Sequence, residues 1–263
     1  MSFPLAADAP VVDLSLGEVA ATLALVAIAA AVSFWRRADL EADLGVAVIR
    51  SFIQLTAIGY VIQAIFDSDS LWLVAALLVV MVLFGAFTAR GRAKGVPNAL
   101  LPLLLALSLA AAVTLGLVLA LGIFDATARY LVPVGGMVIG NSMTAAAVAL
   151  NRLADETRSS AAAIEATLAL GATARQAAAG LVTRSLRSAM IPLIDSTKTT
   201  GIVFFPGTMV GLLVGGAEPV DAVRLQLVLL WALLGSVALA ALVAISLGYR
   251  GFFTPAHQLR ELD

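Results

Sequence analysis

The chain of 263 residues contains no cysteine and a single histidine, His257. The missing cysteines exclude disulfides, thiolate metal sites and cysteine nucleophiles, and they leave the redox compartment undetermined. One histidine cannot build a multi-histidine metal site. The sequence therefore predicts neither a resident metal site nor a cofactor.

Charged residues are also scarce, because Asp, Glu, Lys and Arg together make up 13% of the chain. Hydrophobic residues make up 61% and the mean hydropathy is +1.02, whereas soluble domains are roughly 45–50% apolar and 25% charged. This balance predicts an all-α integral membrane protein, with one transmembrane domain over residues 1–263. The net charge of −1 does not indicate a nucleic-acid partner. The opening MSFPLAADAP has no positive residue, so no cleavable signal peptide is expected.

Seven apolar runs are long enough to cross a bilayer as helices, which takes about 20 residues. They are Leu16–Phe34, Leu44–Phe66, Leu71–Phe87, Leu100–Leu121, Tyr130–Leu150, Met190–Val214 and Leu225–Leu247. Cytoplasmic loops of membrane proteins carry an excess of Lys and Arg. The loops after the odd-numbered runs carry that excess, whereas the opposite loops hold only Arg129 and Arg224. We therefore expect the N-terminus outside and the C-terminus in the cytoplasm.

The fifth and sixth runs contain helix breakers, among them Pro133 and Pro192, together with polar residues. Irregular backbone is tolerated inside a membrane only where protein or water satisfies it, and broken helices often line a substrate path. We therefore expect both runs to be interrupted near mid-membrane. The expected path residues are Asn141, Ser142, Thr144, Asp195, Lys198, Pro206 and Gly207. Asp195 and Lys198 are three residues apart on one helical face, so a purely structural ion pair is the alternative.

The segment over residues 155–187 is rich in alanine and positive charge, and Gly171 interrupts it. Glycine just past a helix end tolerates left-handed backbone angles. Thr173 and Gln176 have the spacing of a capping box, which starts a new helix. The pattern predicts a short cytoplasmic helix over about 160–170, a tight turn and a second helix that leads into the membrane. An ordinary amphipathic connector is the alternative.

The sequence does not predict an enzyme. An intramembrane protease needs a serine with a base, paired aspartates or an H-E-x-x-H helix, and the apolar runs hold no histidine and no second aspartate beside Asp195. A phosphate-binding loop needs glycine before its lysine, but Thr197 precedes Lys198. If ATP drives transport here, another chain hydrolyses it.

Several stretches resemble the FetB/YbbM family of ABC-transporter permeases, bacterial relatives of the plant aluminium-tolerance permease. These are residues 136–153 (GMVIGNSMTAAAVALNRL), 164–177 (IEATLALGATARQA), 191–228 (beginning IPLIDSTKTTGIVFFPG) and 252–259 (FFTPAHQL). The run from Glu165 to Gly171 is similar to the EAA-type signature, a short cytoplasmic helix that fits a groove on the ATPase. Importers have a proline at a fixed distance after that glycine, and Pro192 comes too late, which indicates a separate branch.

The resemblance implies a permease subunit of the bacterial inner membrane that forms a homodimer, docks ABC ATP-binding subunits and exports a metal ion such as iron. It implies that the residues coupled to the ATPase are Ile164, Glu165, Leu168, Gly171, Thr173 and Arg175, with Ala169 adding to the apolar contact of Ile164 and Leu168. Two other classes stay open. One is a stand-alone secondary transporter or channel that uses Asp195 and Lys198, and the other is a membrane scaffold without transport activity.

Overall fold

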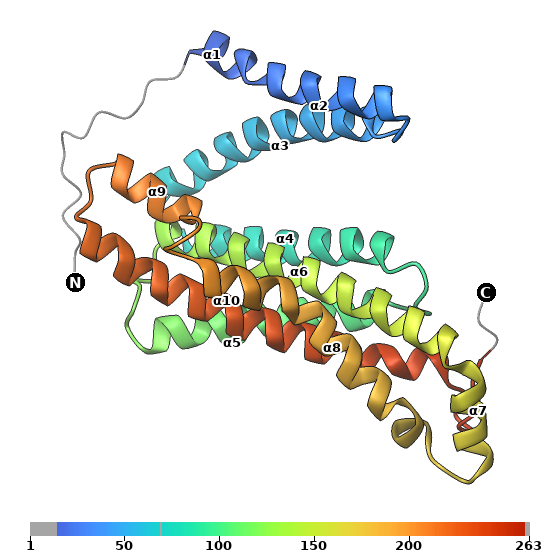
Figure 1. Cartoon of the computed structure of the whole chain (residues 1–263). Helices are drawn as coiled ribbons and strands as arrows, with labels where there is room; N and C mark the ends of the chain where they lie inside the picture. Colours follow the sequence, from blue (N-terminus) through green and yellow to red (C-terminus); the bar gives the residue numbers. More distant parts are fainter. Residues whose placement is uncertain (1–14, 69, 261–263) are drawn as a thin grey trace. The chain divides into compact units, whose positions relative to one another are not determined.

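A computed structural model describes residues 15–68 and 70–260, which form helices and their connections without a named β-strand among them (Figure 1). The opening MSFPLAADAP, and with it the acidic N-terminal tail, lies outside the described residues. The chain divides into two compact units. Unit 1 comprises residues 1–69 and 210–222, and unit 2 comprises residues 70–209 and 223–263.

Unit 1 contains α1 (Leu16–Ala21), α2 (Leu23–Arg36) and α3 (Glu41–Ser68). A capping box of Ser15 and Glu18 starts α1, and α2 packs against α3. Because α1 and α2 are separated by a single residue, they form one apolar helical run of 21 residues.

Unit 2 contains most of the chain's long helices. They are α4 (Leu71–Arg92), α5 (Leu100–Ala120), α6 (Ala128–Ser159), α7 (Ala161–Ala169), α8 (Ala174–Thr199) and the 3₁₀ helix η1 (Tyr249–Phe252). Two further helices, α9 (Gly207–Val214) and α10 (Pro219–Gly248), have residues in both units.

The core of unit 2 lies around α6, which packs against α4, α5 and α8. Small side chains make these contacts close: Ala146 and Ala149 of α6 are fully buried, as are Ala241 and Ala244 of α10. Small residues let helix backbones approach each other, which is how helices associate in a membrane where lipid is as apolar as the side chains. The fixed framework of this unit is therefore the bundle around α6.

Within residues 15–68 and 70–260, six helical runs are long and apolar enough to cross a membrane. They match six of the seven predicted spans, all except Met190–Val214. In that stretch α8 ends at Thr199 and α9 begins only at Gly207. The interruption predicted for the sixth run is therefore confirmed, whereas the count of seven spans and the orientation of the termini remain predictions.

The interruption predicted for the fifth run is wrong, because α6 is one helix from Ala128 to Ser159. Pro133 lies in its second turn, where it removes a single helical hydrogen bond. Gly135 and Gly136 of α6 make room for neighbours instead of breaking the helix. Leu78 occupies the place that a Cβ on Gly135 would take, and a Cβ on Gly136 would lie 3.1 Å from Met81 Cε.

Candidate functional site

The connection between α7 and α8 is the tight turn that the sequence predicts. Gly171 has a left-handed φ of 88°. Its N–H donates to the Leu168 carbonyl at 2.9 Å, and the Ala172 N–H donates to the Thr167 carbonyl at 3.3 Å. This pair of bonds is a Schellman motif, in which glycine is the favoured left-handed residue.

The start of α8 carries the predicted capping box of Thr173 and Gln176, and Arg175 is exposed beside it. A longer-range contact also holds α8: Arg184 Nε donates to Glu156 Oε2 of α6 at 2.8 Å. Sequence reasoning missed this ion pair because its partners are 28 residues apart. The segment that joins α7 to α8 is thus held by local caps, and α8 is held to α6 by packing and by this ion pair.

The side chains that α7 exposes are not all those expected to contact a partner. Ile164 is only 3% exposed, and Leu168 packs against the hydrophobic core. Ile164 is thus buried and Leu168 partly buried within the chain, and their role in contact with an ATPase stays a prediction. The outward face carries Glu165 and Ala169, followed by Leu170, which is 90% exposed and was missed. Because Ile164 is buried and Leu168 partly buried, a partner could reach Glu165, Ala169 and Leu170 more easily than these two residues.

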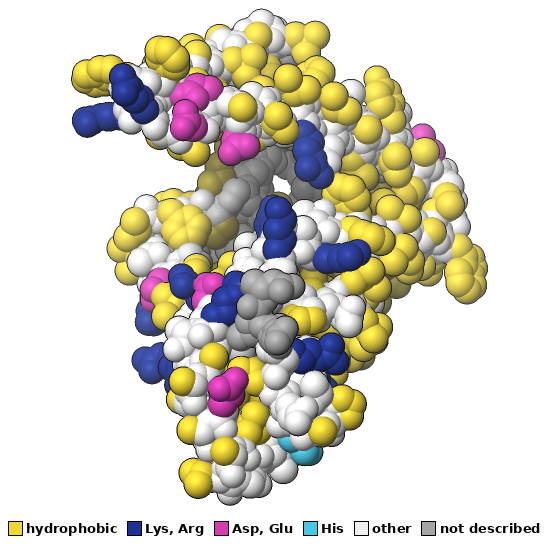
Figure 2. All heavy atoms as spheres, turned by 90° about the vertical axis from the view of Figure 1, so that its right-hand side faces the viewer, with side chains coloured by type: hydrophobic (Ala, Val, Ile, Leu, Met, Phe, Trp, Pro, Cys, Tyr) yellow, Lys and Arg dark blue, Asp and Glu magenta, His cyan; other side chains and the backbone are white. Residues whose placement is uncertain are grey.

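Lys and Arg side chains gather on the face seen in Figure 2, which is the side on which α7 lies in Figure 1. Arg90 and Arg92 lie in the last turn of α4, and Arg158 lies in the last turn of α6. The Arg158 guanidinium lies against Gly95 in the α4–α5 connection. Basic residues at these helix ends are what a cytoplasmic face would carry.

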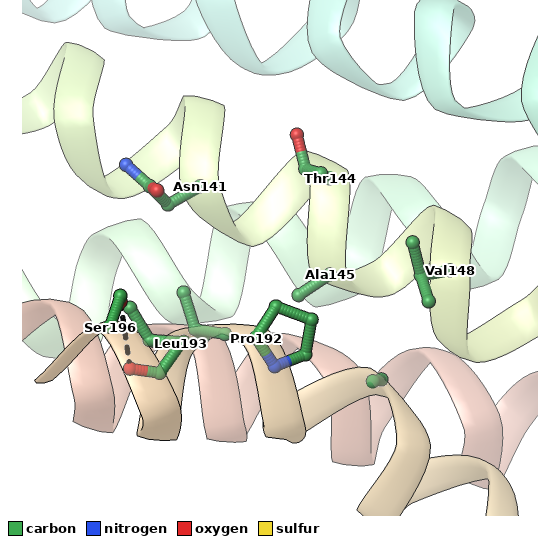
Figure 3. Close-up of a pocket in the computed structure, with 9 residues that line it drawn as sticks. Asn141, Thr144, Ala145, Val148, Pro192, Leu193 and Ser196 are labelled. Atoms are coloured by element: carbon green, nitrogen blue, oxygen red, sulfur yellow. Dashed lines mark hydrogen bonds between the residues drawn. The ribbon is translucent and has the colours of Figure 1, made fainter. Parts of the chain in front are cut away.

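A pocket of about 250 Å³ opens between α6 and α8 (Figure 3). Its lining residues are Asn141, Thr144, Ala145 and Val148 of α6, Ala189, Pro192, Leu193 and Ser196 of α8, and Val237 of α10. The structure thus brings the predicted Asn141 and Thr144 together with Pro192 and Ser196, which were not predicted as site residues.

The polar side chains of the pocket donate their hydrogen bonds to their own helices. Asn141 Nδ2 donates to the Met137 carbonyl at 2.8 Å, Thr144 Oγ1 to the Gly140 carbonyl at 3.2 Å, and Ser196 Oγ to the Leu193 carbonyl at 3.0 Å. In Figure 3 the Asn141 oxygen lies nearer to α8 than its nitrogen does, whereas the Thr144 hydroxyl points away from α8. The oxygen atoms of these three side chains can still accept hydrogen bonds, and the Asn141 amide has a second N–H that can donate one.

The other predicted path residues do not line this pocket. Ser142 is fully buried on another face of α6. Asp195 and Lys198 form the predicted pair, with 3.4 Å between Oδ1 and Nζ, and their side chains are 63% and 70% exposed. Pro206 and Gly207 lie at the break before α9.

A metal cluster is not part of this site. Among the described residues, no three or more His, Asp or Glu side chains come together in a way that could hold an ion. The pocket combines neutral oxygen atoms of polar side chains with an apolar wall.

Comparison with known proteins places the chain among membrane proteins. The model of the "Uncharacterised protein family (UPF0014)" matches residues 16–253. The UPF0014 membrane protein STAR2 of Oryza sativa subsp. japonica is 41% identical over 247 residues, 94% of this chain and 86% of the rice protein. Protein ALUMINUM SENSITIVE 3 of Arabidopsis thaliana is 37% identical over 242 residues, 92% of this chain and 88% of its own length.

A bacterial relative carries a more specific name. The probable iron export permease protein FetB of Escherichia coli (strain K12) is 36% identical over 246 residues, 92% of this chain and 93% of its own length. No solved structure gives a significant match.

Proposed function

The chain belongs to the UPF0014 family, and from this membership we propose that it is the membrane-spanning permease subunit of an ABC transporter. In this proposal two copies of the chain pair in the bacterial inner membrane, and separate ATP-binding subunits hydrolyse ATP on the cytoplasmic side. The cargo is a metal ion such as iron, moved outward. The name of the bacterial relative, a probable iron export permease, supports the cargo and the direction.

The observation that carries the proposal is α7. It is a short helix between α6 and α8, which supply most of the residues that line the pocket, and it ends in a tight glycine turn. One face is anchored by Ile164, while Leu170 is 90% exposed. Leu170 directly follows α7, and in this proposal it is the apolar side chain that the docked ATP-binding subunit covers. A force on α7 reaches the pocket through α8.

The pocket supports a transport path. Asn141 on α6 faces Ser196 on α8, and Thr144 and Pro192 also line the pocket. Proline lacks an N–H group, so it leaves one carbonyl of α8 without its helical partner. Neutral oxygen ligands and a weakened helix suit a site that must bind its cargo and then release it. Movement of α8 relative to α6 would change the width of this pocket.

The decisive experiment is reconstitution of the chain with its ATP-binding subunit in lipid nanodiscs. We expect stable co-purification, and ATP hydrolysis that Fe²⁺ or another divalent metal stimulates. Leu170→Ser removes the exposed contact and lowers complex formation by about tenfold, because a central interface side chain contributes roughly 1–2 kcal/mol. Leu121→Ser is the matched control, since Leu121 is 64% exposed at the C-terminal end of α5.

Two outcomes would contradict the proposal. Transport by the chain alone in vesicles, with no ATP-binding subunit and no ATP, would favour a stand-alone transporter or channel that uses Asp195 and Lys198. Equal loss of complex with Leu170→Ser and Leu121→Ser would show that α7 has no special role in docking.

To test the path, Asn141→Leu keeps a similar side-chain size and removes the amide. We expect metal-stimulated ATP hydrolysis to fall at least about fivefold while basal hydrolysis is retained, because the oxygen acceptor is lost. Stimulation that stays at the parental level would exclude Asn141 from the path.

A further inference from the structure

The C-terminal residues 252–260 form a hairpin that we call the hook. Phe253 and Leu259 make an antiparallel bridge. The Thr254 N–H donates to the Gln258 carbonyl at 2.8 Å, and the Arg260 N–H donates to the Phe252 carbonyl at 2.8 Å. The hook is therefore an ordered structure, and its sequence, FFTPAHQL, is one of the stretches that the function described above does not use.

The base of the hook is anchored in unit 2. Phe252 is 1% exposed and Phe253 is 5% exposed, and both belong to the hydrophobic core. Just before them, a Cβ on Gly251 would lie 2.8 Å from the Pro97 carbonyl oxygen in the α4–α5 connection. Because η1 continues directly from α10, the hook moves with the end of α10.

The tip of the hook reaches the coupling segment. His257 Nδ1 accepts a hydrogen bond from the Ala174 N–H at 3.3 Å, across 83 residues of sequence. Ala174 is the first residue of α8, and the first amide groups of a helix have no partner within the helix. Thr173 and Gln176 satisfy other groups at this end, so His257 completes the cap from outside.

We propose that His257 is a positioning residue that ties the start of α8 to the end of α10. The part of this inference that concerns coupling rests on the proposed permease function. A displacement of α7 then reaches the membrane by two routes, through α8 along the chain and through His257 to η1 and α10. The second route rests on the hydrogen bond from Ala174, beside the direct packing of α8 against η1.

The bond also makes this link dependent on protonation. A neutral imidazole can accept at Nδ1, but an imidazolium carries hydrogens on both nitrogens and can only donate. A positive charge at a helix N-terminus also opposes the helix dipole. Of the elements that meet here, α7 carries Glu165, η1 carries Arg250 and the hook carries Arg260, while α8 carries Arg175 in its first turn and Arg184, Arg187, Asp195 and Lys198 further along.

The first test needs no partner. The amide of Ala174 is followed by hydrogen exchange in the full chain in nanodiscs, for the parental chain, His257→Asn and His257→Gln. Asn places its amide oxygen where Nδ1 lies, and it tolerates the positive φ of 57° at this position. Gln carries its amide one methylene further out. We expect exchange at Ala174 to be about fivefold faster in His257→Gln, the loss of one hydrogen bond, and close to parental in His257→Asn.

Lowering the pH from 7.5 to 5.5 supplies the second readout. Once the intrinsic effect of pH on exchange is corrected for, protection at Ala174 should fall in the parental chain and stay constant in His257→Asn. Equal protection in all three chains at both pH values would overturn the inference, whatever the chain transports.

The third readout is the stimulation of ATP hydrolysis by cargo in the reconstituted complex. We expect cargo-stimulated ATP hydrolysis to fall at least about threefold in His257→Gln and to be retained in His257→Asn, with complex formation unchanged in both. If the parental chain binds no ATP-binding subunit, the proposed function fails while the exchange result still stands. If cargo stimulates ATP hydrolysis equally in the parental chain and in His257→Gln, the positioning role of His257 is wrong.

Discussion

Replacing Gly171 tests the coupling turn most directly, because one backbone angle decides the outcome. Its φ of 88° lies in the region that glycine adopts freely. An L-residue there costs about 1–2 kcal/mol, Asn less, and a β-branched residue more. The side chain itself meets no obstacle, since nothing lies within 4 Å of a Cβ built at this position. The penalty is therefore purely conformational.

The expected magnitude follows from this cost. A penalty of about 1.4 kcal/mol for Gly171→Ala makes an open turn about tenfold more populated. Gly171→Asn should open the turn less than Ala does, and Gly171→Val should open it more. The Ala172 amide reports this directly, because its bond to the Thr167 carbonyl closes the turn. Cargo-stimulated ATP hydrolysis should fall in the same order, with Gly highest, then Asn, Ala and Val.

Hydrogen exchange at Ala172 and ATP hydrolysis are measured on the same reconstituted samples. The matched control is Gly116→Ala in the middle of α5, where the backbone is helical and the surroundings are open. This change should cause no loss, since alanine is about 0.5–1 kcal/mol better than glycine within a helix. Parental exchange in all three Gly171 variants would refute the conformational argument. Ordered exchange with unchanged ATP hydrolysis would refute the role of α7 in coupling.

Two further predictions concern contacts elsewhere in unit 2. Gly251→Ala places a Cβ against the backbone carbonyl of Pro97, which cannot rotate away, so the free energy of unfolding should fall by about 1–3 kcal/mol. Gly235→Ala, with open space around it, should not lower the melting temperature, and equal melting of both variants would contradict the reasoning. For Asp195 and Lys198, a double-mutant cycle of Asp195→Asn and Lys198→Met should give an interaction free energy of at least about 0.5 kcal/mol in detergent unfolding. Strictly additive effects would mean that the pair does not interact.

Local patterns in the sequence were reliable guides. The capping box of Thr173 and Gln176 depends on two residues three positions apart, and Gly171 ends α7 through its own backbone freedom. Six membrane spans could likewise be predicted, because a bilayer selects helices by length and apolar content alone. In the caps the interacting groups are close in sequence, and in the spans the lipid bilayer acts on the whole segment.

Contacts between distant segments could not be predicted. Gly135 and Gly136 were expected to break their helix, but Leu78 and Met81 fill the space that those glycines leave. A glycine in an apolar run is compatible with either role, and only the neighbouring helix decides between them. Ile164 was expected on the partner-facing side of α7, and the core of unit 2 buries it instead.

The sequence alone determined that this is a helical membrane protein with a capped helical turn at Gly171, because hydropathy and capping act over short distances. Only the tertiary structure decided that Asn141 faces Ser196 across a pocket, that Leu170 is the exposed apolar side chain of the turn, and that His257 caps α8. These contacts join residues far apart in the chain, and no periodicity or spacing records which pairs the packing brings together.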